Sequence, residues 1–329
     1  RERMWDVSEY AAQVEALGEA CRGRDVAAMQ LAPMIDCFPV DARDHTQSLG
    51  LAAMQGLDEC IRALNHAVWW QERRDQLLAA GVDQLAQVCS EPPQLGVRLD
   101  EAVAKGLLAA AGVEVPVLRT TTPEKAHEAA AEIGFPVALK ALDARLLHKT
   151  EVGAVKIGLY SQDAVRTAVA NMRADMQQLA PDIPLRTMLV EAMASDVVAE
   201  VMASISHDPS VGPVMMIAGG GIEAELWNDS TLLAAPFTRQ EISRAFCRLK
   251  AAQRINGWRR RPAGDIEALL DALQALAGFA LSNKVEEVEI NPILVGKTGV
   301  LAVDAVLKMA GLPANNNKPL PEAKRGEHA

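Results

Sequence analysis

The chain has 329 residues, of which 50% are hydrophobic, 23% are charged and only 4% are aromatic. This length allows about two domains, and the apolar content excludes a wholly disordered chain. Lys and Arg number 33 against 43 Asp and Glu, which gives a formal net charge of −10. An acidic chain repels nucleic acid and anionic lipid, and no apolar stretch approaches the roughly 18 residues of a membrane span. We therefore expect neither a nucleic-acid nor a membrane partner.

The cysteines are odd in number and scattered, and none forms a CxxC pair; they are Cys21, Cys37, Cys60, Cys89 and Cys247. This pattern indicates neither a zinc cluster nor a disulfide framework. Reduced thiols in a cytoplasmic protein are the expected state. The first residue is Arg1 and not Met, from which we expect a fragment or a processed part of a longer polypeptide.

Residues 1–80 alternate between helical and strand patterns. Apolar spacing predicts helices over 8–22 and 57–78, with a short buried strand within 28–40. In the second helix one face is apolar; it carries Leu57, Ile61, Leu64, Val68 and Trp69. The run Ser90-Glu91-Pro92-Pro93-Gln94-Leu95-Gly96 has no period and predicts a linker, which we bound at residues 81–98.

Beyond the linker, helices and strands are more regularly interleaved. The predicted helices cover 101–111, 122–134, 162–179, 239–253 and 265–282. The predicted strands cover 113–118, 136–140, 154–160, 187–191, 197–206, 213–218, 285–295 and 299–307. The last two strands are expected to form a hairpin about residues 296–299. We interpret Met172 and Met176 as core residues, and the polar, Pro-rich residues 313–329 as a disordered tail.

Unusual polar residues are concentrated between Ala138 and Gly158. Lys140 lies in an aliphatic strand, where it needs an anionic partner or access to solvent; the alternative is a protective lysine on an edge strand. His148 follows two leucines, so on its own it is compatible with a hydrogen-bonded packing histidine. Lys149 and Lys156 are close by in the sequence, and this pattern also fits a loop that faces an anion. A histidine in such a loop could carry a phosphoryl group covalently.

Three consecutive glycines follow an apolar strand. Gly219, Gly220 and Gly221 would let backbone N–H groups approach phosphate oxygens. A tight turn is the simpler interpretation, since the run is neither a Walker A loop nor a complete GxGxxG motif.

Two glutamates stand in otherwise apolar strands. Glu191, in the segment LVEAM, lies at the end of the strand predicted over 187–191, and Glu200 lies within VVAEVMASIS. A carboxylate in such a strand needs a metal, a ribose hydroxyl or a lysine as partner, unless it lies on a solvated outer face.

The last predicted hairpin carries oxygen donors. Period-two alternation places Glu289 and Asn291 on one face of their strand, with Asp304 on the partner strand. Oxygen ligands on neighbouring strands suit Mg²⁺, which needs few protein ligands besides phosphate oxygens. The alternative is cross-strand hydrogen bonding, with Asn291 starting a turn before Pro292.

Taken in order, these segments resemble the ATP-grasp domain of NDP-forming (ADP-forming) acyl-CoA synthetases, relatives of the succinyl-CoA synthetase β subunit. The segments are PVALK, LLHKTEVGAVKIG, LVEAM, AEV, GPVMMIAGGGIEAELWND, EVEINPILV and VLAVDA. The resemblance implies an α/β (α+β) chain: an ATP-grasp fold with two subdomains over 99–312, preceded at 1–80 by the C-terminal part of a flavodoxin-like CoA-ligase domain. We expect the nucleotide to lie between two mixed sheets.

The resemblance also implies a role for each matching residue. Lys140 and Lys149 would bind ATP or ADP together with Gly219, Gly220 and Gly221, which would surround the phosphates. Glu191 and the backbone through Met193 would meet the adenine, and Glu200 the ribose. Asn291 and Asp304 match the family's Mg²⁺ ligands, with Glu289 beside them. His148 matches the histidine that carries phosphate between a first phosphohistidine and ADP.

Two residues depart from the family's pattern. Ala154 replaces the second glycine of HK[ST][DE]VGGV, and its β-carbon could crowd a phosphate or stiffen the loop. Leu233 stands where the family tends to place an Arg after the [KN]D pair. The first phosphohistidine motif and the CoA-binding Rossmann segment are absent from this sequence. A carboxylic acid and CoA would then bind through the missing region or an α-type subunit, and we expect an oligomer.

The implied activity is phosphoryl transfer within an acid–thiol ligase: carboxylate + CoA + ATP = acyl-CoA + ADP + phosphate, through a phosphohistidine. One alternative is a non-catalytic regulatory ATP-grasp module of a larger protein, such as a fused acyltransferase. Another is an ATP-grasp ligase that joins a carboxylate to an amine; such enzymes need no histidine carrier, and His148 therefore favours the CoA ligase.

Overall fold

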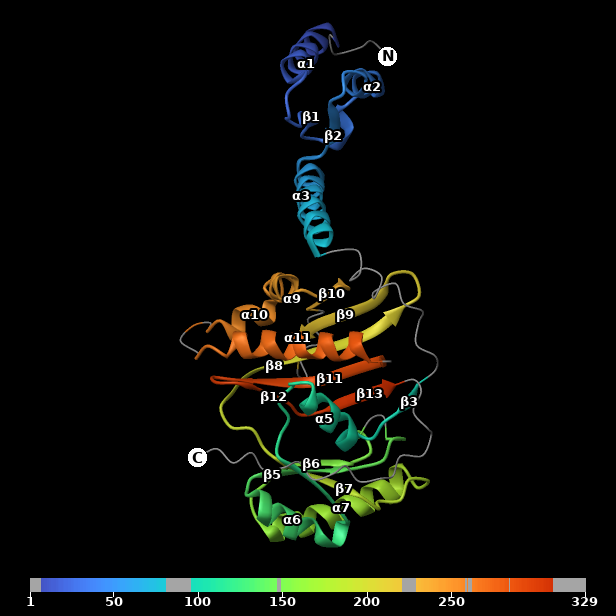
Figure 1. The fold of residues 1–329 in the computed structure, drawn as a ribbon, viewed down its shortest axis with the longest axis vertical. Coiled ribbons are helices and arrows are strands. Elements are labelled where there is room, and N and C mark those ends of the chain that lie inside the picture. Colours follow the sequence, from blue (N-terminus) through green and yellow to red (C-terminus); the bar gives the residue numbers. More distant parts are fainter. Residues whose placement is uncertain are drawn as a thin grey trace. The chain divides into compact units, whose positions relative to one another are not determined.

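The structure is a computed structural model of the chain. It describes residues 7–80, 96–146, 149–220, 229–257, 259, 262–283 and 285–309. The chain divides into two compact units, Arg1–Val82 and Asp83–Ala329 (Figure 1). The predicted tail at 313–329 and most of the predicted linker lie outside the described residues. Among the described residues, no helix has both the length and the apolar character needed to cross a bilayer.

The first unit contains a small parallel sheet. Strands β1 (Met29–Ala32) and β2 (Ala52–Gln55) pair in parallel, with Met29 opposite Ala52. They are connected through η1 (Ile35–Cys37) and α2 (Val40–Ser48), and α1 (Val7–Cys21) packs against α2. A strand, a connecting helix and a parallel strand form the basic unit of α/β folds.

The long helix α3 (Leu57–Ala80) confirms the helix predicted at 57–78. Its apolar face, however, is exposed over the described residues. Leu57, Ile61, Leu64, Val68 and Trp69 keep 42–59% of their surface accessible. The helix is therefore amphipathic, but this unit does not cover its apolar face.

The second unit is built on two antiparallel sheets. Over the described residues, the larger sheet has the order β10-β9-β8-β11-β13-β3, with β12 paired to β11, and the smaller has the order β4-β7-β5-β6. The strands of the larger sheet are β3 (Val97–Arg98), β8 (Val197–Asp208), β9 (Gly212–Gly219), β10 (Ser230–Ala234), β11 (Val285–Gly296), β12 (Val300–Ala302) and β13 (Ala305–Met309). Those of the smaller are β4 (Leu118–Thr121), β5 (Val137–Ala141), β6 (Val155–Leu159) and β7 (Met188–Ala192). The expectation of mixed sheets was wrong, because the described strands of both sheets pair only in the antiparallel sense.

Each sheet has its own hydrophobic core. Helices α9 (Arg239–Phe246), α10 (Lys250–Ile255) and α11 (Ile266–Ser282) pack with the larger sheet, and α5 (Glu101–Ala110) packs against β13 (Figure 1). The smaller sheet packs with α6 (Ala126–Ile133), which follows η2 (Pro123–Lys125), and with α7 (Gln162–Leu179). Met172 and Met176 are buried in this second core, as predicted.

Three predicted elements differ from the structure, and an identifiable hydrogen bond marks each difference. The strand expected at 113–118 begins only at Leu118, because the Val113 N–H donates to the Leu108 carbonyl and so closes the end of α5. The helix expected at 239–253 is two helices, since the side chain of Asp229 accepts hydrogen bonds from the N–H groups of Lys250 and Ala251 and starts α10.

The third difference is an interruption in the last predicted strand. It breaks between β12 and β13, where the Val303 N–H donates to the Pro292 carbonyl. At this break the carbonyl oxygen of Val303 is left to accept hydrogen bonds from Lys105 and Lys140.

Candidate functional site

Six charged side chains meet between the two sheets of the second unit. We call them the charge cluster: Glu101, Lys105, Lys140, Lys149, Glu191 and Asp304. Glu101 and Lys105 lie on α5, Lys140 on β5, Glu191 on β7, Lys149 before β6 and Asp304 between β12 and β13. Elements of both sheets therefore contribute charges to one site.

Two lysines of the cluster are each surrounded by three oxygen atoms. Lys140 Nζ lies 2.6 Å from Glu101 Oε1 and 3.0 Å from Glu191 Oε2, and it also donates to the Val303 carbonyl. Lys105 Nζ lies 2.8 Å from Glu101 Oε1 and 2.7 Å from the Val303 carbonyl, and it also donates to Glu191. An ammonium group has three N–H donors, and each of these two has three acceptors.

Lys149 lies nearer to solvent. It pairs with Glu101 Oε2 and, at 3.0 Å, with Asp304 Oδ1. The side chain of Asp304 is 36% exposed, whereas that of Lys105 is wholly buried. The cluster thus runs from a dry end at Lys105 to a wetter end at Asp304.

Mutual attraction opposes the cost of burying these charges. Burial would raise the pKa of Glu101, but Lys105, Lys140 and Lys149 together hold that pKa well below its usual range. Burial would likewise lower the pKa of Lys140, yet Glu101, Glu191 and Asp304 raise it above its ordinary value. Burial dominates at Lys105, whose pKa is lowered despite the carboxylates around it.

The local sequence explains how these side chains come together. The Asp100 side chain accepts from the Val103 N–H at 2.9 Å and so begins α5. Residues four apart share a helix face, and Glu101 and Lys105 accordingly point to one side. On the smaller sheet Lys140 is opposite Leu189, which puts Lys140 and Glu191 on the same face of neighbouring strands.

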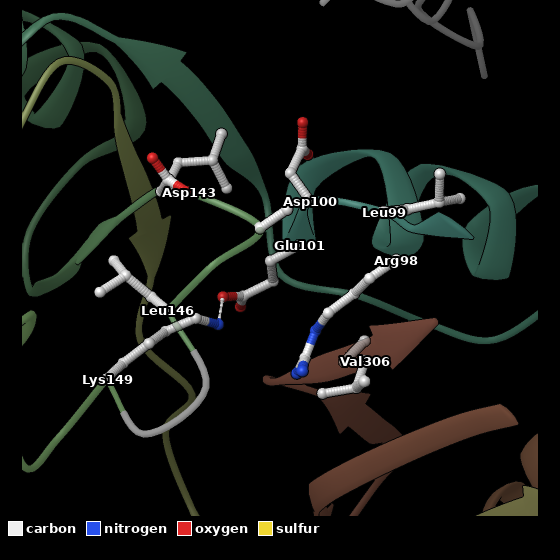
Figure 2. Close-up of a pocket in the computed structure, with 11 residues that line it drawn as sticks. Arg98, Leu99, Asp100, Glu101, Asp143, Leu146, Lys149 and Val306 are labelled. Carbon is white, nitrogen blue, oxygen red and sulfur yellow. Dashed lines mark hydrogen bonds and ion pairs between the residues drawn. The ribbon is translucent and has the colours of Figure 1, made fainter. Parts of the chain in front are cut away.

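A small open pocket lies beside the cluster. Figure 2 shows Glu101 and Lys149 pointing toward each other in it, with the side chain of Arg98 lying beside Val306. Asp143 and Leu146 line the same pocket. Leu147 and His148 lie outside the described residues, so the predicted carrier histidine is known here only by its position between Leu146 and Lys149 in the sequence.

The predicted metal ligands gather at the wet end of the cluster. The Asn291 N–H donates to the Asp304 carbonyl at 3.2 Å. Burial raises the pKa of Glu289, and the charges of Glu287 and Asp304 raise it further, while a hydrogen bond with the side chain of Asn291 opposes them. Two carboxylates and one amide oxygen are a donor set that fits Mg²⁺. Over the described residues, no group of three His, Cys, Asp or Glu side chains is placed to hold a metal.

Within the glycine run, Gly220 is packed against the backbone of β8. The Gly220 N–H donates to the Glu200 carbonyl at 2.7 Å, and a β-carbon at Gly220 would lie 2.7 Å from the Glu200 carbonyl carbon. Gly219 ends β9 and has more room, and Gly221 lies outside the described residues. Glycine is thus required at position 220, because the chain after β9 passes too close to the backbone of β8 to leave room for a β-carbon.

The end of β7 is already hydrogen-bonded in this structure. The Ala192 N–H donates to the Val117 carbonyl at 2.9 Å, and the Met193 N–H donates to the Pro136 carbonyl at 3.1 Å. The carboxylate of Glu191 is 2% exposed and faces Lys105 and Lys140. Their predicted contact with adenine stays a prediction, as does that of Glu200 with the ribose.

Both departures from the family pattern are apolar packing positions. Ala154 is fully buried in the core of the smaller sheet, where its carbonyl accepts from the Ala141 N–H. Leu233 on β10 packs against the core of the larger sheet. The methyl group of Ala154 thus contributes to the core of the smaller sheet.

Sequence reasoning did not single out Glu101 and Lys105. Both stand in the helix sequence EAVAKGLLAA, where two opposite charges four residues apart lie within an apolar pattern. That pairing is a signal that could have found them.

Comparisons with known proteins identify the fold and its relatives. The profile of the ATP-grasp domain family matches residues 94–309, and the chain belongs to that family. Within that family, its relatives are ADP-forming acyl-CoA synthetases. It is 30% identical to the β subunit of an ADP-forming acetate–CoA ligase of Pyrococcus furiosus, over 63% of this chain and 90% of that subunit. Among solved structures, the dinucleotide-forming acetyl-coenzyme A synthetase 1 of Ca. Korarchaeum cryptofilum matches with a TM-score of 0.61 and 30% identity, over 65% of this chain and 93% of that one.

Longer relatives are covered only in part. A trans-feruloyl-CoA synthase is 30% identical over 71% of this chain, but the match spans 32% of its own length. The acetate–CoA ligase I of Archaeoglobus fulgidus is 30% identical over 64% of this chain and 30% of its own. The chain therefore spans about a third of these relatives and most of a separate β subunit.

Proposed function

We propose that the chain is the nucleotide-binding and phosphoryl-transfer part of an acid–thiol ligase that converts carboxylate, CoA and ATP to acyl-CoA, ADP and phosphate. The observation that carries this proposal is the charge cluster, where lysines from the smaller sheet meet the oxygen donors of the larger one. Phosphoryl transfer depends mainly on positioning and on offsetting phosphate charge, and this junction supplies both. The relatives named above are ligases and synthases, and they do not favour the regulatory alternative.

Lysines and backbone amides would hold the nucleotide. Lys140 and Lys149 bind phosphate oxygens in this proposal. The resemblance adds the glycine run from Gly219 to Gly221. The N–H groups of Gly219 and Gly220 donate to the Asp229 and Glu200 carbonyls in this structure, so they would exchange these partners for phosphate oxygens. Glu191 and Met193 stand at the adenine and Glu200 at the ribose, on the strength of the resemblance. The comparison structure was solved in complex with coenzyme A and Ca-AMPCP, which supports nucleotide and CoA as ligands of the complete enzyme.

Magnesium fits the oxygen donors at the wet end of the cluster. Asn291 and Asp304 would hold the ion with Glu289 beside them, and a bound Mg²⁺ would offset phosphate charge. Another form of the Korarchaeum enzyme was solved with Mg-AMPPCP and a phosphohistidine segment pointing towards the nucleotide binding site.

His148 is the proposed phosphoryl carrier. A ring nitrogen of His148 bonds to the γ-phosphorus of ATP while the bond from that phosphorus to the ADP oxygen breaks. The products are phosphohistidine and ADP, and one ring proton is released. The reverse step returns the phosphoryl group to ADP. Support comes from the sequence position of His148, next to Lys149 of the cluster.

The complete reaction needs more protein than this chain spans. The carboxylic acid and CoA would bind through further sequence of a longer polypeptide or through an α-type subunit, in an oligomer. The first unit would be the end of a CoA-ligase domain, for which its parallel strands and connecting helix are the support. In the described residues the cysteines are free thiols, which is compatible with a location in the cytoplasm.

Labelling from γ-labelled ATP with Mg²⁺ tests the proposal. The chain should take up label that is labile in acid and stable in base, as expected of a phosphohistidine. His148→Ala should abolish the label and leave ADP affinity nearly unchanged. His127→Ala is the matched control, because His127 lies on α6 and is not one of the residues of the charge cluster. Full labelling of the His148 variant would show that another residue is the carrier.

A further inference from the structure

Glu101 occupies the position of a bridging anion. Its Oε1 lies 2.6 Å from Lys140 Nζ and 2.8 Å from Lys105 Nζ, and its Oε2 pairs with Lys149. Two oxygens on one anionic group therefore join three ammonium groups. A phosphate group offers the same arrangement, since it too presents several anionic oxygens from one centre.

The oxygens around Lys140 limit what it can bind in this state. Its Nζ donates hydrogen bonds to Glu101 Oε1 and the Val303 carbonyl, and it forms an ion pair with Glu191 Oε2 at 3.0 Å. A phosphate oxygen that binds Lys140 must therefore compete with these three acceptors, two of which are carboxylate oxygens. Lys149 makes two such contacts, with Glu101 and Asp304, which leaves one donor for an incoming anion.

Lys105 can hold Glu101 after such an exchange. It is fully buried, and Glu101 is its partner one helical turn earlier on α5. Because the pair lies within one helix, Glu101 can remain bonded to Lys105 while Lys140 and Lys149 turn toward another anion. The carboxylate then stays paired and avoids the large cost of an isolated buried charge.

We propose that Glu101 is an internal counter-anion that holds Lys140 and Lys149 in the nucleotide-free protein and is exchanged for phosphate oxygens when nucleotide binds. Glu101 is a positioning residue, acting through the two lysines and making no contact with nucleotide. The proposal rests on the proposed function, since it takes Lys140 and Lys149 as the phosphate-binding lysines. It assigns a role to a side chain that the resemblance left without one.

Removing the charge of Glu101 should tighten nucleotide binding. Glu101→Gln keeps the shape but removes the competing anion and raises the positive charge of the site by one unit. The affinity for Mg·ADP should rise by about tenfold. At an effective dielectric constant of about 20, the Coulomb energy between two unit charges a few ångströms apart exceeds the free energy that corresponds to a tenfold change in affinity. The measurement is isothermal titration calorimetry on the full chain.

The matched control is Glu241→Gln. Glu241 is also a buried glutamate of the second unit, but it belongs to the capping box of α9, and its variant should bind Mg·ADP as the wild type does. Unchanged or weaker binding by Glu101→Gln would overturn the proposal. If the wild type itself bound no Mg·ADP, the proposed function would fail, which is a distinct result.

A crystal structure of the wild type with Mg·ADP gives a second test that needs no variant. The Lys149 ammonium should then contact a phosphate oxygen, with Glu101 still bonded to Lys105 and out of hydrogen-bonding distance of Lys149. A complex in which Glu101 keeps its bonds to both Lys140 and Lys149 would contradict the exchange, even if Glu101→Gln proved unable to fold.

Discussion

Lys105 shows how strongly one residue can depend on its partners. Its side chain is wholly buried, and a lone ammonium group in such a place would lose its proton or unfold the protein. The carboxylate of Glu191 and the Val303 carbonyl accept hydrogen bonds from it, and the carboxylate of Glu101 forms an ion pair with it at 2.8 Å. Lys105 thus pairs with two buried glutamates at once. Its loss would leave both carboxylates without this cation, and that is why it matters for the stability of the fold.

We expect Lys105→Met to destabilise the second unit strongly. The variant keeps most of the side-chain volume but leaves two buried carboxylates short of a cation, which costs about 3–5 kcal/mol when one partner of a buried pair is removed. Urea unfolding gives the change in the free energy of unfolding.

Lys156→Met is the matched control for this prediction. Lys156 pairs with Asp175 at 2.8 Å, with side chains 30% and 41% exposed, and an exposed pair is worth about 0–1 kcal/mol. Equal losses for the two variants would show that the buried cluster contributes no more than a surface ion pair.

At the scale of elements, the ends of strands decide where the site lies. The break between β12 and β13 turns the Val303 carbonyl toward Lys105 and Lys140, and an unbroken strand would have used that carbonyl in its own ladder. A second close approach lies just after β9, where Gly220 meets the backbone of Glu200 and Val201 in β8. Both features lie where a strand ends, the first at the end of β12 and the second at the end of β9.

The two glycines at the end of β9 should respond differently to alanine. A β-carbon at Gly220 would lie 2.7 Å from the Glu200 carbonyl carbon and 2.8 Å from the Val201 nitrogen, and backbone atoms cannot move aside easily. Gly220→Ala should cost about 1–3 kcal/mol, as overpacking does. Thermal unfolding followed by circular dichroism measures it.

Gly219→Ala supplies the comparison from the adjacent position. The nearest atom to its new β-carbon would be Ala251 Cβ at 3.5 Å, an ordinary contact, so its stability should change by no more than about 0.5 kcal/mol. A tolerated Gly220→Ala would mean that the strand ends separate more readily than the packing indicates.

Over the whole molecule, stability is divided between units. The two cores of the second unit consist of residues from Leu99 onward, and none of the described residues 7–80 belongs to either of them. The charge cluster likewise draws all its members from the second unit. Folding of the second unit and nucleotide binding should therefore not require the first.

We expect a fragment of residues 83–329 to fold and to bind Mg·ADP with the affinity of the full chain. Calorimetry would give the affinity, and differential scanning calorimetry would give the unfolding temperature beside that of the full chain. A fragment that folds but loses affinity would assign part of the nucleotide site to the first unit.

Much of this protein could be read from the sequence. Period and turn residues predicted α7, the strands β5 to β9 and the hairpin at Gly296–Gly299, because these elements depend on local pattern. The order of the motifs was specific enough to identify the family, which the profile match over 94–309 supports. Lys140 was predicted to need either an anionic partner or access to solvent, and it has two anionic partners in Glu101 and Glu191.

Only the tertiary structure decided which charges meet. Glu101 and Glu191 are 90 residues apart in the sequence, and no local pattern links them or directs both toward Lys105. The break at Val303, the start of α10 at Asp229 and the close approach at Gly220 also depend on distant segments. Local pattern fixes elements because backbone conformation is set by near neighbours, whereas a buried charge cluster forms only where packing brings remote side chains out of water together.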